Sequence, residues 1–218
     1  MFGTVGLEQK IFLTEIPTPG QNVFCNSQSK CLSGNAVRLA LHLAALDFPV
    51  SFTASLAEDL EKAELSRLLA EQPQLRCELM ESESKENGLK VTLEDTKKEF
   101  RSIRVRPGAS IKFDSDRVRE IVKSKDLVVV CDEVAEVCAV KILSIAREEN
   151  KPTLYLSFSG NPISAELESL SDKSFSFEDG ICCGDAVRKI RFGSEKPDQE
   201  KEVENSLTSG KTMMKGTA

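Results

Sequence analysis

The fold class is decided by residues 126–160, DLVVVCDEVAEVCAVKILSIAREENKPTLYLSFSG. The run at 126–132 is continuously apolar in its centre, as is typical of a strand buried on both faces. Residues 133–149 have the three- and four-residue apolar spacing of a helix, and residues 151–160 form a second apolar strand pattern. A strand, a helix and a strand in this order predict a βαβ unit, and therefore a largely parallel sheet with right-handed crossovers.

The chain before this unit already alternates between helices and strands. GNAVRLALHLAAL at 34–46 predicts a well-buried helix, and PVSFTASL at 49–56 predicts a strand. Residues 58–71 have an acidic first turn followed by regularly spaced leucines, which predicts an amphipathic helix. These segments extend the α/β pattern towards the beginning of the chain.

Residues 88–106 interrupt that alternation. GLKVTLED at 88–95 and EFRSIRVR at 99–106 alternate polar and apolar residues on either side of three polar residues, which predicts a β-hairpin. Because both runs alternate, one face of the hairpin is expected to be solvated or thinly covered. A helix is expected to follow at 114–125. The sequence therefore predicts an α/β body with a small inserted sheet.

Composition excludes several classes of protein. The chain has 218 residues, of which 40% are hydrophobic and 29% charged, as in globular domains. Its net charge of −6 argues against nucleic acid as a partner. It has no apolar run of membrane-spanning length and no secretory leader pattern, so we expect a cytoplasmic protein without membrane contact. Seven cysteines without a CxxC pair, together with one histidine, favour reduced thiols over disulfides or a zinc site.

Several segments, in order, resemble the ribokinase-like carbohydrate kinases of the phosphofructokinase-B type. They are EIPTPGQNV at 15–23, LSGNAVRLALHLAALDFPVSFTASLAED at 32–59, RVRPGASIKF at 104–113, LYLSFSGNP at 154–162 and FEDGICCGDAVRKIRFG at 177–193. The resemblance implies a three-layer α/β/α, Rossmann-like fold with a mostly parallel sheet and a small β lid. In this family the first buried strand precedes an early glycine, and only Met1 and Phe2 precede Gly3, so that central strand is expected to be shortened or missing.

The same resemblance predicts how the chain is divided. Residues 1–192 are expected to form a partial ribokinase-like domain, with lid strands at about 11–30 and 88–106. The C-terminal part of the family fold is expected to be missing. Residues 193–218 are polar and are expected to be loosely ordered.

On the sugar side, the resemblance places altered residues at the family's binding positions. Glu8 stands for the family's aspartate, Ser33 and Gly34 for its paired glycines, Arg38 for its helix asparagine and Ser110 for the asparagine after Pro-Gly-Ala. Arginine only donates hydrogen bonds, so a neutral sugar would lose an acceptor. An acidic or phosphorylated sugar would suit this position better.

On the phosphate side, the resemblance fails at the residues that do the chemistry. The family's Asn-x-x-Glu pair falls on Gly184 and Val187, and valine cannot hold a hydrated magnesium ion. No segment matches the glycine-rich loop that cradles the transferring phosphate, since CCGDA at 182–186 comes too early. We therefore expect no catalytic residues, no metal and no cofactor, with ATP and magnesium bound only if the chain is an active kinase.

Other motifs have ordinary explanations. The SGKT at 209–212 lacks the first glycine of a phosphate loop and follows a polar segment. His42 lies in an apolar helix and is interpreted as a helix residue, not a catalytic base. Asp132 and Glu133 follow the strand at 126–132, where open α/β sheets bind ligands. They remain candidate site residues beside the alternative of acidic residues at a helix N-terminus.

Two hypotheses follow for the function. In the first, the chain is a non-catalytic interaction or regulatory relative of a sugar kinase, whose lid pairs with a second copy or another protein. In the second, it binds a sugar or sugar phosphate, or is an ATP-dependent sugar kinase with an altered site.

Overall fold

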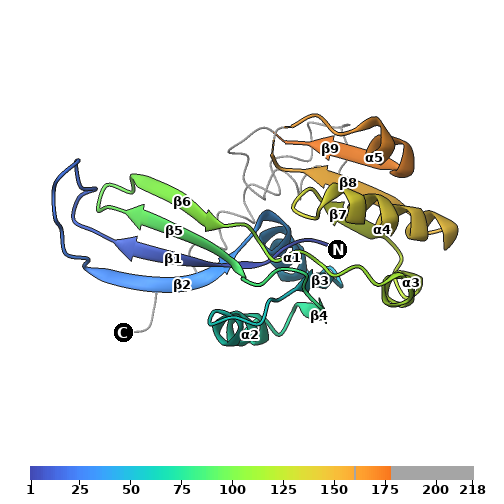
Figure 1. Ribbon diagram of the computed structural model, residues 1–218, viewed down its shortest axis with the longest axis horizontal. Helices are drawn as coiled ribbons and strands as arrows, with labels where there is room; N and C mark the ends of the chain where they lie inside the picture. Colours follow the sequence, from blue (N-terminus) through green and yellow to red (C-terminus); the bar gives the residue numbers. More distant parts are fainter. Residues whose placement is uncertain (160, 178–218) are drawn as a thin grey trace.

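The structure is a computed structural model that describes residues 1–159 and 161–177 (Figure 1). An α/β body contains the parallel strands, and a second sheet extends away from it, at the left of the view. We call this second sheet the projecting sheet.

All strand pairs of the body sheet are parallel. β3 pairs with β4, β7 pairs with β8, and β8 pairs with β9. The strands are β3 (Ser51–Ser55), β4 (Arg76–Met80), β7 (Val128–Cys131), β8 (Thr153–Ser157) and β9 (Lys173–Ser176). The predicted βαβ unit is present as β7, α4 (Glu136–Glu148) and β8. The prediction of a mainly parallel sheet is therefore confirmed.

The centre of the body sheet is formed by the first residues of the chain. Phe2 makes parallel bridges to Thr53 on one side and to Val130 on the other. Its N–H donates to the Val129 carbonyl at 2.7 Å, and its carbonyl accepts from the Cys131 N–H at 3.1 Å. Phe2 thus joins the two halves of the sheet.

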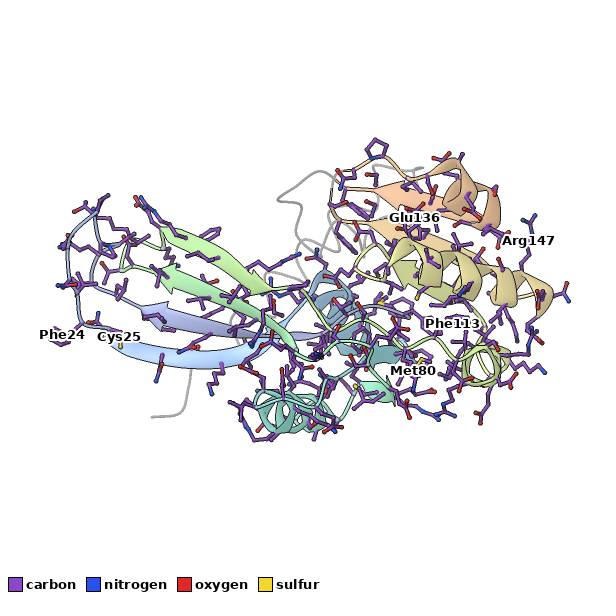
Figure 2. The ribbon with its side chains drawn as sticks, in the orientation of Figure 1. Phe24, Cys25, Met80, Phe113, Glu136 and Arg147 are labelled. Atoms are coloured by element: carbon purple, nitrogen blue, oxygen red, sulfur yellow. The ribbon has the colours of Figure 1, made fainter. Side chains whose placement is uncertain are left out.

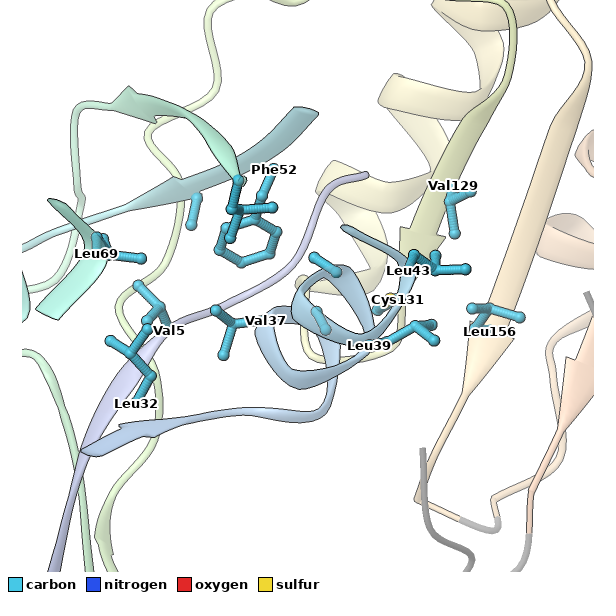
Figure 3. Close-up of a cluster of buried hydrophobic side chains, with 14 of the residues drawn as sticks. Val5, Leu32, Val37, Leu39, Leu43, Phe52, Leu69, Val129, Cys131 and Leu156 are labelled. Carbon is cyan, nitrogen blue, oxygen red and sulfur yellow. The ribbon is translucent and has the colours of Figure 1, made fainter. Parts of the chain in front are cut away.

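Helices cover both faces of the body sheet. α1 (Asn35–Ala45) and α2 (Lys62–Ala70) contribute to one buried cluster, whereas α3 (Ser115–Lys123), α4 and α5 (Ala165–Leu170) contribute to the other. Val129 and Cys131 of β7 pack with Leu39 of α1 (Figure 3). Val130 points the other way, into the cluster of Ile142. This alternation produces the predicted three layers.

The projecting sheet has the strand order β2-β1-β5-β6. Its strands are β1 (Gly6–Phe12), β2 (Ser27–Ser33), β5 (Gly88–Glu94) and β6 (Phe100–Arg106). β1 and β5 run parallel at its centre, and each pairs antiparallel with an outer strand. The predicted hairpin of 88–95 and 99–106 is confirmed. Figure 2 shows Phe24 and Cys25 at the tip of this sheet, far from the body.

The expected limits of the first lid segment were wrong. β1 begins at Gly6 rather than near residue 11, and β2 continues to Ser33. Residues 15–23 lie in the loop between these strands and form no strand themselves. Two prolines there lack a backbone donor, and Gly20 has a φ of 85°, so the segment suits a turn rather than a ladder.

Some elements were not predicted, and some predictions lie outside the described residues. The unpredicted elements are β4, α5 and β9, which are short and lie at or near the edge of the body. The predictions for Gly184 and Val187, for 182–186, for 193–218 and for 209–212 fall outside the described residues. Within residues 1–159 and 161–177, no helix is long and apolar enough to cross a membrane.

Candidate ligand-binding cleft

A cleft of about 490 Å³ lies where the projecting sheet leaves the body. Four of the residues singled out from the sequence line it, namely Ser33, Gly34, Ser110 and Glu133. They come from β2, from the turn before α1, from the segment after β6 and from the end of β7. The fold thus brings residues that are distant in the sequence to one place. Glu8, Arg38 and Asp132 are not among the lining residues.

Glu8 lies on β1 and is buried, with 2% of its surface exposed. Its carboxylate accepts a hydrogen bond from Thr92 Oγ1 at 2.6 Å and forms ion pairs with Lys90, at 3.2 Å, and with Arg38. Burial alone would raise the pKa of Glu8, but the hydrogen bonds from Thr92 and Lys90, with the charges of Lys90 and Arg38, outweigh it and lower the pKa. Glu8 is therefore an ionised group whose partners belong to the chain itself.

Arg38 lies in the first turns of α1, which presents its apolar residues to the body core. Its guanidinium points to Glu8 across the junction between the body and the projecting sheet. Glu8 was expected to accept hydrogen bonds from a sugar, and Arg38 was expected to lie beside that sugar. In the structure the two side chains bind each other. The sequence placed both at one site but did not indicate that they would pair.

Glu133 caps the N-terminus of α1. Its carboxylate accepts from the backbone N–H of Asn35 at 2.6 Å, from that of Ala36 at 3.2 Å and from Thr4 Oγ1 at 3.4 Å. Burial raises the pKa of Glu133, and the two backbone donors oppose this only in part. Gly34 has a φ of 127°, and a Cβ there would lie 2.8 Å from the Thr4 carbonyl oxygen. Only glycine lets the chain turn at this point beside the carboxylate.

Asp132 has a different environment from Glu133. It accepts from Ser157 Oγ at 3.0 Å and from the backbone N–H groups of Phe158 and Ser159, each at 2.9 Å. These bonds tie the end of β7 to the end of β8. The two neighbouring acids therefore face different surroundings, and only Glu133 lies on the cleft.

Basic residues dominate the charged part of the cleft wall. Lys85, Lys90, Arg104 and Arg106 line it, against Glu86 and Glu133. Lys90 and Arg104 are direct partners across β5 and β6. Like charges opposite each other in a sheet repel, so an anion between them would be stabilising. From the sequence, one face of this hairpin was expected to be solvated or thinly covered, and a position of its cations on a cleft was not predicted.

Within residues 1–159 and 161–177, no three His, Cys, Asp or Glu side chains are grouped so that they could hold a metal ion.

Comparisons with known proteins bear on the fold. No protein-family model matches the chain, and no curated protein matches it. Among solved structures, a ribokinase from Arabidopsis thaliana complexed with ribose and ATP is 17% identical, with a TM-score of 0.62, over 86% of this chain and 66% of that one. Thermotoga maritima ribokinase gives 13% identity and a TM-score of 0.63, over 88% and 62%. Escherichia coli phosphofructokinase-2 gives 15% and 0.60, over 78% and 54%.

The chain thus spans between about half and two-thirds of the length of these kinases. The layers of the parallel body are those that the resemblance in sequence implied. The chain has a ribokinase-like carbohydrate kinase fold.

Proposed function

We propose that the protein is a non-catalytic, carbohydrate-kinase-like module whose projecting sheet serves as a lid and associates with a second copy of the chain. The observation that carries this proposal is the exposed outer strand β6. Phe100, Ile103 and Val105 on this strand are 69%, 64% and 53% exposed. Large apolar groups on one edge strand favour a protein interface.

The edge of β6 is suited to pairing. The strand has seven residues, without proline or glycine, and within residues 1–159 and 161–177 no other strand pairs with its outer side. Natural sheets usually protect such edges with short strands, prolines or covering segments. In a two-fold dimer, antiparallel pairing centred on Ile103 would bring this residue against its own copy.

The state of Glu8 supports the absence of sugar phosphorylation. Its oxygens are engaged by Thr92, Lys90 and Arg38, so they are poor acceptors for the hydroxyls of a neutral sugar. In addition, Gly184 and Val187 replace the family's magnesium-positioning residues in the sequence. The first point concerns the binding of the sugar, and the second concerns the stabilisation of the phosphate charge. Phosphoryl transfer depends on both.

The dimer is tested by light scattering after size exclusion, with a matched pair of variants. Ile103→Asp should give a monomer under conditions in which the unmodified chain is a dimer, because a buried carboxylate would oppose pairing. Val137→Asp is the control, since Val137 is 67% exposed on α4 of the body; it should leave the dimer intact. A monomeric unmodified chain, or a dimer unaffected by Ile103→Asp, would contradict the proposal.

A second candidate function is binding of an anionic sugar, such as a sugar phosphate, in the cleft. Its support is the charged part of the cleft wall, where Lys85, Lys90, Arg104 and Arg106 stand against Glu86 and Glu133, with Arg104 opposite Lys90. The excess positive charge favours a ligand with negative charge, and arginine suits phosphate oxygens.

This second function is tested by thermal unfolding with neutral sugars, their phosphates, inorganic phosphate and ATP–magnesium. Sugar phosphates should raise the melting temperature, and the matching neutral sugars should not. A ligand present at a hundred times its Kd adds about 2.7 kcal/mol to the free energy of unfolding. Arg104→Ser should abolish the shift, whereas Arg117→Ser on α3 should not. Equal shifts for neutral sugars would reject the anionic ligand, and a shift with ATP–magnesium would contradict the non-catalytic proposal.

We also propose that the protein is cytosolic. Cys25, Cys31, Cys77 and Cys138 are free thiols, a state typical of reducing compartments.

A further inference from the structure

The root of the projecting sheet is built from glycines. Gly6 of β1 pairs with Gly88 of β5, and a Cβ on Gly6 would lie 2.8 Å from the Gly88 carbonyl oxygen. A Cβ on Gly88 would lie 2.9 Å from the Gly108 Cα, and one on Gly108 would lie 2.5 Å from the Thr4 side chain. Backbone thus lies against backbone between Gly6 and Gly88 and between Gly88 and Gly108, whereas Gly108 lies against the Thr4 side chain. No interdigitating side chains from these three positions oppose bending of the sheet relative to the body.

Two ion pairs connect the sheet to the body next to these glycines. Glu8, two residues beyond Gly6, binds Arg38 of α1. Arg106, two residues before Gly108, binds Glu61 at the N-terminus of α2 at 2.9 Å. Each pair joins one strand of the projecting sheet to one helix of the body, so together they brace the glycine root from two directions.

The pair with Glu8 is the better anchored of the two. Glu8 is 2% exposed, and Thr92 and Lys90 hold its carboxylate from β5, so the acceptor cannot swing out to solvent. Glu61 has a side chain that is 22% exposed. An ion pair in which one partner is buried and held by further groups restrains motion more than one between two partly exposed groups.

We infer that Arg38 is a positioning residue, which with Glu8 fixes the angle of the projecting sheet at its glycine root without any ligand. A sheet held in this way presents its outer strand β6 in one orientation. This inference does not depend on whether β6 pairs with a second copy.

Hydrogen exchange of the full chain, followed by mass spectrometry, tests the inference. In Arg38→Asn, the amides of β1 and β5 should exchange at least about tenfold faster than in the unmodified chain. A tenfold change corresponds to roughly 1.4 kcal/mol in the free energy of local opening. Amides of β7 and β8 should be unchanged. Arg38→Lys, which keeps the charge, should recover much of the protection. Arg117→Asn is the control, because it removes an arginine–glutamate pair on α3.

A second comparison separates bracing from a loss of overall stability. Glu8→Gln should accelerate the same amides, and the double variant should add little beyond either single variant, because both remove one interaction. Measurements at two protein concentrations identify any protection that comes from association. Unchanged exchange in Arg38→Asn, equal acceleration in β7 and β8, or fully additive effects would overturn the inference.

Discussion

Glu8 shows how one residue can keep a family position and change its role. It is a carboxylate where the resemblance implies an aspartate, but the structure surrounds it with Arg38, Lys90 and Thr92. A buried carboxylate needs such partners because an unpaired charge away from water is costly. The consequence is a residue whose ionised form stabilises the folded chain.

The pH dependence of Glu8→Gln tests this consequence. The folded-state pKa of Glu8 is lowered, so its stabilisation is present above the ordinary carboxyl pKa of about 4.3 and is lost as the pH falls through the lowered value. Arg38, Lys90 and Cys31 also face this carboxylate. Glu8→Gln should lower the unfolding free energy by about 1.5–3 kcal/mol at pH 7, measured with urea.

At acid pH the difference between wild type and Glu8→Gln should shrink. Glu120→Gln, which changes an exposed glutamate of α3, should alter stability by less than about 0.5 kcal/mol at either pH. A difference for Glu8→Gln that stays constant down to pH 3 would show that the charge of Glu8 is not the cause.

For single residues, the sequence predicted which positions lie at the cleft better than it predicted which side chains contact each other. Ser33, Gly34, Ser110 and Glu133 could be chosen from the order of motifs, and the fold brings them to one cleft. The hydrogen bond from Thr92 to Glu8 could not be predicted, because it joins residues 84 apart in the chain and requires the parallel pairing of β1 with β5. Contacts of this kind are decided by tertiary register, which local patterns do not contain.

At the scale of elements, Asp132 connects two strands of the body. Its carboxylate accepts from Ser157 and from the N–H groups of Phe158 and Ser159, where β8 ends. Asp132→Ala should therefore cost about 1–3 kcal/mol of stability through its unsatisfied donors, measured by chemical unfolding.

Two further observations keep this prediction specific. Asp126→Ala, at an exposed position just before β7, should change stability by less than about 0.5 kcal/mol. Since Asp132 does not line the cleft, its variant should keep any ligand-induced rise in melting temperature. Loss of that rise with stability intact would instead make Asp132 part of the binding site.

The elements that the sequence predicted share one property. α1, α4, β7 and β8 bury continuous or strictly periodic apolar residues, so their patterns are strong. β4 was missed because RCELM at the edge of the sheet carries charged, partly exposed residues. Strands at an edge need no apolar alternation on both faces, so their sequences resemble loops.

At the scale of the whole molecule, stability depends on Phe2. It is 2% exposed and bridges both halves of the body sheet. Phe2→Ala should lower the unfolding free energy by about 3–5 kcal/mol, the usual cost of removing a buried phenylalanine. Phe24→Ala is the matched control, because Phe24 is 97% exposed; it should change stability by less than about 0.5 kcal/mol. Similar effects for both variants would contradict the central role of Phe2.

The position of Phe2 in the middle of the sheet also bears on how the protein folds during synthesis. Phe2 is synthesised well before one of its two bridge partners, Val130, which follows only after the projecting sheet and three helices have been made. The middle of the sheet must therefore stay open while most of the chain is translated, and its closure is a contact of very long sequence separation. Such contacts slow folding and leave strand edges exposed meanwhile. The nascent chain should accordingly depend on chaperones until β7 has emerged.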